Sequence, residues 1–299
     1  MPPAAPRNVP IEVPIEGLRT WVAARVRAGV IGSPEHAAAR HAALFESPGE
    51  RWFAPDAAIC RVHGDSSMFV GGLRALLLQS LHPLAMAGVA EHSDYRADPW
   101  GRLQRTADFL AATTYGPAAE AERAVATVRA VHGRVTGVAA DGRPYAANDP
   151  HLLRWVHLAE IDSFLAAHER YGAERLTPAE RDEYVGQTAV VARALGVPAP
   201  PESVRALHDQ LRAFRPELAS TPEAREAARY LLVRPPMPLA ARPLYGVLAA
   251  AAVALLPRWA RGPLRLPYLP VSEAIAVRPA GEALTRTLRW ALRRDEAAD

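Results

Sequence analysis

A capping residue followed directly by proline recurs along this chain and constrains its fold more than any other sequence feature. The pairs are Asp98-Pro99, Asp149-Pro150 and Thr177-Pro178, with Ser33-Pro34 ahead of them. The oxygen of an Asp, Ser or Thr side chain accepts hydrogen bonds from the free amides at a helix start. Proline fits the first helical turn because its missing amide hydrogen is not needed there. Each pair therefore predicts the start of a helix.

Between these starts, Ala, Leu, Arg and Glu dominate, and all four favour helices. Glycines predict several of the helix ends. The expected helices cover residues 34–45, 99–115, 117–136 and 150–171, with another beginning at residue 178. A further apolar helix is expected after Gly71-Gly72, kinked or broken at Pro83. Sustained strand-like alternation is absent from the sequence, so it predicts an all-α fold.

The chain shows no internal repeat and no low-complexity linker long enough to separate two domains. The proline-rich stretches at residues 198–201 and 235–243 are interpreted as connections between helices. We therefore expect an extended N-terminal arm over residues 1–30, one helical domain over 31–290 and a disordered tail over 291–299. A hydrophobic fraction of 49% suits one large packed core.

Composition excludes several classes of chemistry. All 35 basic residues are arginine, so no lysine Schiff base can form. The single cysteine, Cys60, excludes intrachain disulfides and multi-cysteine metal sites. A lone thiol and the lack of an export signal in residues 1–17 favour the cytoplasm. The net charge of +3 comes without a basic stripe, so no nucleic-acid partner is expected.

Two apolar runs resemble membrane spans in composition. Residues 73–89 include Arg74, His82 and Pro83, and residues 244–256 extend only about 20 Å as a helix against a ~30 Å hydrocarbon core. Both are interpreted as buried helices, without a transmembrane span. A peripheral membrane contact by the second run is left open.

His132 is the first candidate for chemistry. It shares a helix face with Val125, Val128, Val131 and Val135, which are expected to point inward. For this helix alone, a core histidine bonded to a backbone carbonyl is the commoner interpretation.

A second group is formed by Arg102, Arg105 and Thr106, which share one face of the helix that begins at Pro99. Two neighbouring guanidinium groups are either solvated or hold an anion such as a carboxylate or phosphate. Both interpretations stay open at this point.

Other candidates lie on two further helices. His157 and Glu160 stand three residues apart on an apolar face, which suits either a metal or an ordinary polar pair. The absence of a second Glu-x-x-His gives a di-iron site little support. His82, Glu91 and His92 lie on and just after the helix broken at Pro83, where they either satisfy freed carbonyls or line a pocket.

Taken together, these residues form an ordered series of motifs. The series runs Arg74-Ala75-Leu76-Leu77-Leu78-Gln79, His82-Pro83, Gly88-Val89-Ala90-Glu91-His92-Ser93, Asp98-Pro99-Trp100-Gly101-Arg102-Leu103-Gln104-Arg105-Thr106, Val128-Arg129-Ala130-Val131-His132-Gly133-Arg134-Val135-Thr136-Gly137, Tyr145-Ala146-Ala147-Asn148-Asp149-Pro150 and Trp155-Val156-His157. It resembles the family of MpaB-type oxygenases and rubber oxygenases (latex clearing proteins). The resemblance covers at least residues 61–184.

The resemblance implies a globin-related helical core that holds haem b, and a reaction of dioxygen with carbon–carbon double bonds of isoprenoid chains. It places the axial iron ligand on His132, and it places Arg102, Arg105 and Thr106 near the haem propionates or the distal pocket. Glu91 is the nominee for the family's catalytic glutamate.

One departure concerns Arg105, because rubber oxygenases carry a lysine there and arginine does not ligate iron. The distal side is then expected to hold water, to stay open or to take another ligand such as His157. The other departure is the missing export signal, which disfavours rubber itself as substrate. The expected function is a haem-dependent oxygenase acting on an unsaturated, isoprenoid or lipid-like small molecule. The alternative is a non-catalytic haem sensor or carrier.

Overall fold

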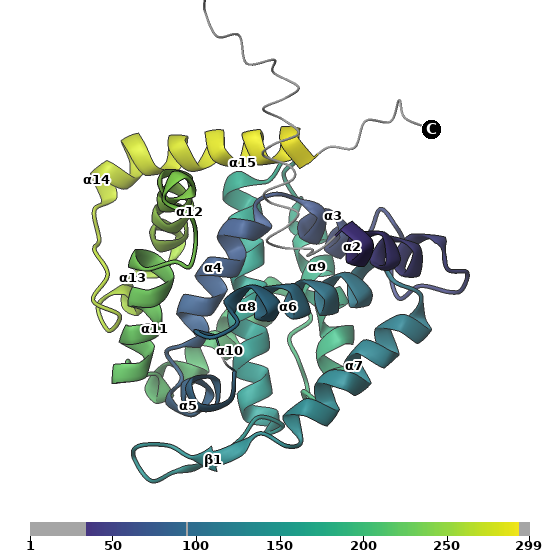
Figure 1. Ribbon diagram of the computed structural model, residues 1–299, viewed down its shortest axis with the longest axis horizontal. Coiled ribbons are helices and arrows are strands. Elements are labelled where there is room, and N and C mark those ends of the chain that lie inside the picture. The colour runs from purple at the N-terminus through teal and green to yellow at the C-terminus, as the bar shows by residue number, and fades with distance from the viewer. Residues whose placement is uncertain (1–33, 94, 293–299) are drawn as a thin grey trace, which may run out of the picture.

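The computed structural model describes residues 34–93 and 95–292, and within them the fold is a single, mostly helical domain (Figure 1). Its α-helices are α2 (Pro34–His41), α3 (Ala58–Gly64), α4 (Met68–Gln79), α5 (Pro83–His92), α6 (Pro99–Tyr115), α7 (Ala118–His132), α8 (Pro150–Tyr171), α9 (Pro178–Leu195), α10 (Val204–Phe214), α11 (Pro222–Val233), α12 (Arg242–Leu255), α13 (Arg258–Arg261), α14 (Pro270–Ser272) and α15 (Arg278–Leu292). Short π- and 3₁₀-helical turns are η1 (Ala42–Glu46), η2 (Arg215–Glu217), η3 (Leu239–Ala241) and η4 (Glu273–Val277). The strands are β1 (Thr136–Val138) and β2 (Pro144–Ala146). The predicted arm (1–30) and most of the predicted tail (293–299) lie outside the described residues.

The capping pairs at Asp98, Asp149 and Thr177 start helices as predicted. The Asp98 carboxylate accepts a hydrogen bond from the Gly101 amide at 2.9 Å, and the Asp149 carboxylate accepts one from the His151 amide at 2.8 Å. Thr177 forms a complete capping box with Glu180. The helices predicted over 99–115 and 150–171 are confirmed as α6 and α8.

The helix predicted over 117–136 is too long. It ends at His132, and the chain continues into β1, which pairs antiparallel with β2 through Thr136↔Ala146. The turn between the strands uses Gly142 at φ +86°, a conformation that favours glycine. The fold is therefore mostly helical with one small hairpin, rather than all-α. Three-residue strands are too short to give a pattern of alternation in the sequence.

The long helix α8 lies at the centre of the fold and packs along α4 more extensively than any other described pair of helices does. Gly71 allows this approach, because an added Cβ would lie 3.0 Å from the Phe164 ring and 3.1 Å from its Cα. Gly71-Gly72 thus lie inside α4, which begins at Met68, and do not precede the helix as predicted. Apolar side chains such as Leu77 and Trp155 are fully buried at this contact region of the core.

The predicted break at Pro83 is confirmed, with α4 and α5 bent by 108° across it. None of the described helices is by itself long and apolar enough to span a membrane. The bent pair of α4 and α5 together has the length and composition of a span. The second apolar run forms α12. Its Ala249, Ala251 and Ala252 are buried against the core, whereas Leu244 near its start is exposed.

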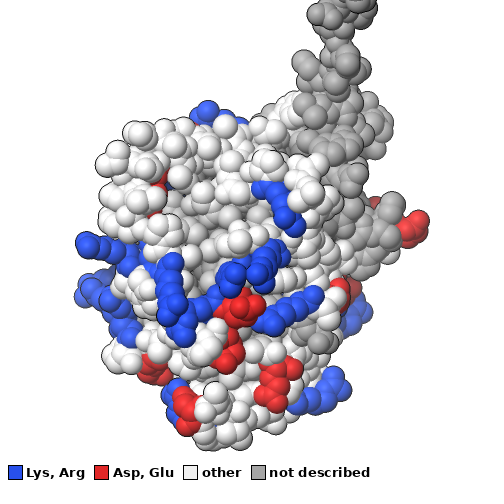
Figure 2. Space-filling view, turned by 60° about the vertical axis from the view of Figure 1, so that its left-hand side comes forward, with Lys and Arg blue, Asp and Glu red and all other residues white. Residues whose placement is uncertain are grey.

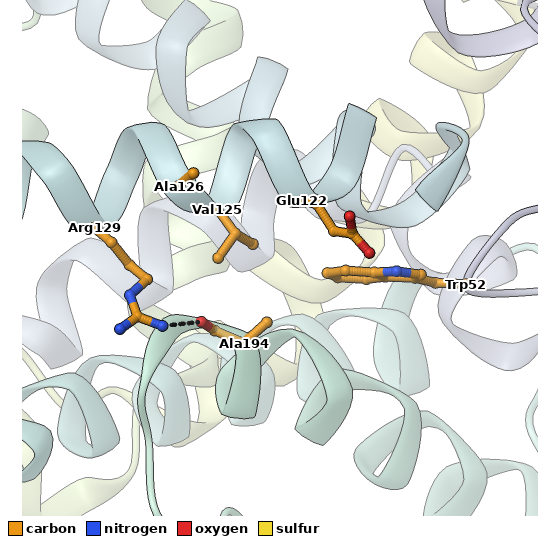
Figure 3. A pocket seen from close by; sticks show the side chains of 6 residues that line it. All are labelled: Trp52, Glu122, Val125, Ala126, Arg129 and Ala194. Carbon is orange, nitrogen blue, oxygen red and sulfur yellow. Dashed lines mark hydrogen bonds between the residues drawn. The ribbon is translucent and has the colours of Figure 1, made fainter. Parts of the chain in front are cut away.

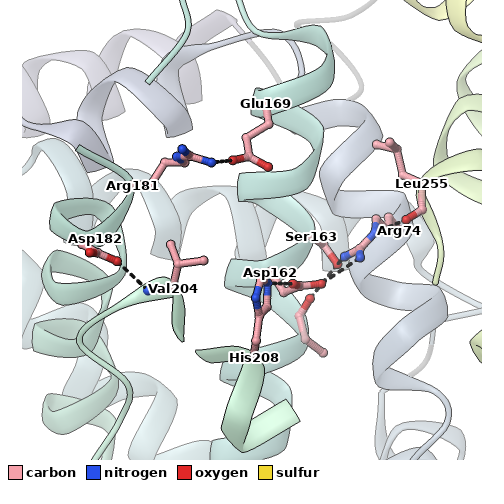
Figure 4. Close-up of polar contacts among 10 residues, drawn as sticks. Arg74, Asp162, Ser163, Glu169, Arg181, Asp182, Val204, His208 and Leu255 are labelled. Carbon is pink, nitrogen blue, oxygen red and sulfur yellow. Dashed lines mark hydrogen bonds and ion pairs between the residues drawn. The ribbon is translucent and has the colours of Figure 1, made fainter. Parts of the chain in front are cut away.

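A buried arginine fixes α4 to α8 and to the end of α12 (Figure 4). Arg74, 3% exposed, donates to the Asp162 carboxylate at 2.7 Å, to the Ser163 hydroxyl at 2.6 Å and to the Leu255 carbonyl at 2.9 Å. His208 on α10 approaches the second oxygen of Asp162 at 3.6 Å. The three nitrogen atoms of this one guanidinium group therefore link α4 to α8 and to α12.

We expect Arg74→Ala to lower the free energy of unfolding by about 3–5 kcal/mol, because it leaves the Asp162 carboxylate buried without its partner. Chemical denaturation measures this loss. Arg123, which pairs with Glu120 on the surface of α7, is the matched control, and Arg123→Ala should change stability by less than about 1 kcal/mol. Equal effects of the two substitutions would contradict the role assigned to Arg74.

Candidate functional site

Helices α6 and α7 form a hairpin that stands apart from α8. They join at Gly116-Pro117, pack on each other near that turn and diverge from it (Figure 1). α6 also packs on α3 and α7 on α9, but neither packs closely along α8. The β1–β2 hairpin connects the far end of α7 to the start of α8. Helices α6 and α7 are therefore held mainly by each other, by α3 and by α9 rather than by α8.

Glu160 on α8 is an enclosed carboxyl. Protein atoms surround it, and this burial raises the pKa of its carboxyl to about 7. Its side chain nevertheless keeps part of its accessible surface. Within the described structure, Glu160 has neither a hydrogen bond nor an ion pair. At neutral pH this carboxyl is about half protonated.

A chain of polar groups lies beside Glu160. The His63 ring contacts the Thr114 hydroxyl through Nδ1 at 2.9 Å and the Tyr184 hydroxyl through Nε2 at 3.4 Å. Burial lowers the pKa of His63 to about 3 and raises that of Tyr184 far above its usual value, with the Glu160 charge adding to the latter. Both groups are therefore neutral. The sequence gives no sign of this contact, because His63 and Tyr184 lie on different helices, α3 and α9, and belong to no common motif.

His157 lies one helical turn before Glu160, as its sequence position requires. It is buried, its Nε2 atom has no hydrogen-bond partner, and burial lowers its pKa to about 4. A neutral imidazole with a free nitrogen is a potential metal ligand. A joint role of His157 and Glu160 in binding a metal stays a prediction.

His132 is the last residue of α7 and is half-buried. Burial lowers its pKa, and its ring makes no hydrogen bond to any residue that the structure describes. The commoner interpretation, a core histidine bonded to a carbonyl, is therefore wrong for this structure. Val125 and Val128 share its inward face, but Val131 is 45% exposed, since it lies off that stripe.

Arg102, Arg105 and Thr106 do not act together in this structure. Arg102 is largely enclosed, donates to the Ser93 hydroxyl at 3.0 Å and has no carboxylate partner among the described residues. Burial lowers the pKa of this guanidinium group. Arg105 is exposed and pairs with Asp98 at 3.1 Å, while the Thr106 hydroxyl donates to the Arg102 carbonyl at 3.0 Å. Arg102 alone is thus an enclosed cation without a counter-charge.

Glu91 and His92, at the end of α5, meet Tyr145 of β2. The Tyr145 hydroxyl donates to the Glu91 carboxylate, and His92 Nε2 lies 3.1 Å from the same hydroxyl. Burial and the Glu91 hydrogen bond raise the pKa of Tyr145 to about 12. Gly137 permits this contact, because a Cβ there would lie 2.3 Å from the Tyr145 hydroxyl. Glu91 itself is exposed, and His82 lies apart from this cluster, beyond the other end of α5.

A shallow hollow of about 480 Å³ lies between α7 and α9 (Figure 3). Trp52, Val125 and Ala194 line it, and Arg129 closes one end by donating to the Ala194 carbonyl at 3.2 Å. None of the candidate residues lies in its wall, so this hollow is not the site.

We expect Glu160 to make stability depend on pH. Below about pH 4.5 it is protonated in both the folded and the unfolded chain. Between about 4.5 and 7 only the folded chain keeps the proton, so the free energy of unfolding falls as the pH rises and stays reduced above 7. Glu160→Gln should therefore stabilise the protein at pH 8 relative to the wild type, by on the order of 2–3 kcal/mol, and have little effect at pH 4.5. Urea denaturation at both pH values tests this, and an equal effect at both would contradict it.

Residues 60–293 match the family described as "ER-bound oxygenase mpaB/B'/Rubber oxygenase, catalytic domain". No curated protein and no solved structure matches the chain. The family match spans most of the chain, including every candidate residue from Glu91 to Glu160. The chain is an enzyme that belongs to the MpaB and rubber oxygenase catalytic-domain family.

Proposed function

We propose that this enzyme is a haem b-dependent oxygenase that uses dioxygen to oxidise an unsaturated hydrophobic small molecule, of isoprenoid or lipid-like character. The observation that carries this proposal is His132. It is a half-buried, neutral imidazole without a hydrogen-bond partner among the described residues, and it belongs to an oxygenase catalytic domain. A neutral imidazole nitrogen without such a partner is able to bind a metal.

The described side chains fit a haem group. His132 and His157 offer neutral imidazole nitrogens for iron, and Arg102 offers an enclosed cation for a propionate carboxylate. The globin-related core expected from the resemblance stays a prediction that accompanies this proposal.

Haem, when bound, supplies an iron that takes up and activates dioxygen. The chain's own groups then position the substrate and manage protons. Leu153 and Val156 keep accessible surface on α8 beside Glu160 and offer apolar contacts to a hydrocarbon chain. Glu160, with its pKa of about 7, can hold or accept a proton at neutral pH and suits acid–base work better than the exposed Glu91.

The resemblance assigns roles near the haem or in catalysis to Arg105, Thr106 and Glu91. These roles require the side chains to leave their present partners. Arg105 would have to leave Asp98, and Glu91 would have to leave Tyr145, before either contacts a reacting group. We further propose a cytoplasmic location, since the buried thiol of Cys60 suits a reducing compartment.

The alternative is a haem-binding sensor or carrier, and one observation favours it. His157 Nε2 has no partner and is available as a second iron ligand. An iron with two protein ligands has no free position for dioxygen, so the ligand number separates the two functions.

We expect protein produced with a haem precursor to show a Soret absorption band, and His132→Ala to lose most of it, because this variant lacks the imidazole that would hold the iron. Visible spectra of both proteins measure this. His208→Ala, which removes an exposed imidazole that pairs with Asp162, is the matched control and should keep the band. If the wild type shows no Soret band, the proposal is wrong.

Carbon monoxide then distinguishes oxygenase from sensor. If the reduced wild type binds it readily, one iron position is open, as an oxygenase requires. If only His157→Ala binds it readily, His157 occupies that position and the carrier or sensor function is favoured.

Arg102→Ala should weaken haem retention, because a propionate loses its buried counter-charge. Transfer of haem to an excess of apomyoglobin measures the loss rate, which should rise roughly tenfold or more, as for the loss of a charge-assisted hydrogen bond. Arg105→Ala, on the next turn of the same helix, is the control, since Arg105 is exposed and pairs with Asp98. The role of Arg102 is wrong if both variants lose haem at the same rate.

A further inference from the structure

A second group of potential metal ligands lies apart from the proposed haem site. His82 immediately precedes α5, His151 is the second residue of α8 and Glu217 ends η2. One ligand atom from each lies within 4.8 Å of the other two. The Glu217 Oε2 atom is 2.7 Å from His151 Nε2 and 3.6 Å from His82 Nε2.

His82 is the residue that calls for an explanation. It is 2% exposed, and neither nitrogen of its ring has a hydrogen-bond partner. The rings of Trp155 and Phe214 lie beside it, each with its centroid 6.3 Å from the His82 centroid. Burying an imidazole without partners costs free energy, so such a group is rare unless something else binds it.

We propose that His82, His151 and Glu217 bind a divalent transition-metal ion, with Zn²⁺ as the best fit. Ligand atoms at about 2.0–2.1 Å from a tetrahedral zinc lie about 3.3 Å apart, and the two distances to Glu217 bracket that value. Two imidazole nitrogens favour zinc over Mg²⁺ or Ca²⁺, which prefer oxygen ligands. His151 and Glu217 are about half exposed, which leaves the fourth position to water.

The charges around the group allow a cation. Glu217 supplies a negative charge beside the two imidazole rings. Arg143 acts on His82 with a positive charge, and it pairs with Asp141 at 2.7 Å. The repulsion from Arg143 is thus partly offset by its own counter-ion.

A bound ion would tie three segments together. It would link the break between α4 and α5 to the start of α8 and to η2, where a backbone hydrogen bond from Ala219 to the Leu81 carbonyl already joins two of them at 2.8 Å. This role is structural, and it is independent of whether haem binds at His132.

Isothermal titration of the chelator-treated, full-length protein with Zn²⁺ alone tests the proposal. We expect one ion per chain, with His151→Gln and Glu217→Gln each weakening the affinity at least about tenfold. Both side chains are half exposed, so these variants should fold, which circular dichroism checks. His208→Gln is the matched control, because it removes an exposed histidine that faces a different carboxylate, Asp162, at 3.6 Å.

Thermal unfolding gives a second readout. Zn²⁺ should raise the melting temperature of the wild type and of His208→Gln, but not that of His151→Gln or Glu217→Gln, because only a folded site binds the ion. The proposal is overturned if the wild type takes up no Zn²⁺, or if both ligand variants bind it as tightly as the wild type does.

Discussion

The close packing of α4 against α8 is the contact on which the rest of this structure depends. Gly71 lets the two backbones approach, and Arg74 then joins Asp162 and Ser163 of α8 to the end of α12. A buried guanidinium group contributes little net stability as a pair, but its several fixed donors allow few alternative arrangements. The remaining helices surround this pair, and the α6–α7 hairpin lies on one side of α8.

The α6–α7 hairpin does not pack closely along α8. On α8, the His157 Nε2 atom and the Glu160 carboxyl are enclosed by protein and lack polar partners. On α6, Arg102 is enclosed and donates to the Ser93 hydroxyl, but it has no counter-charge among the described residues. Each such group costs desolvation free energy. A protein that keeps several of them does so at the expense of stability, as sites for ligands and catalysis commonly do. The same reasoning applies, at a separate place, to the unpartnered ring of His82.

The two groups of histidines differ in what surrounds them. His132 and His157 have no carboxylate bonded to the ring, whereas His82 and His151 share Glu217. Neutral imidazoles in apolar surroundings suit a large, mostly apolar cofactor, and a carboxylate beside two imidazoles suits a bare divalent cation. The proposed haem site and the proposed zinc site would therefore bind different groups and would not compete for one metal ion.

Local chemistry in the sequence determined where α6 and α8 begin and end and where α9 begins, because a cap such as Asp98 or Asp149 acts within one turn. It also placed His157 and Glu160 three residues apart on one helix and His132 in register with Val125 and Val128. The sequence could not place β1 and β2, which are too short to show a pattern, or the exposure of Val131. Only the tertiary structure brought His63 and Tyr184 beside Glu160. It also gave Arg102 and Arg105 different partners, Ser93 and Asp98. The group of His82, His151 and Glu217 likewise exists only in the folded chain. These groupings depend on contacts between segments far apart in the chain, and spacing along a sequence carries no information about such distances.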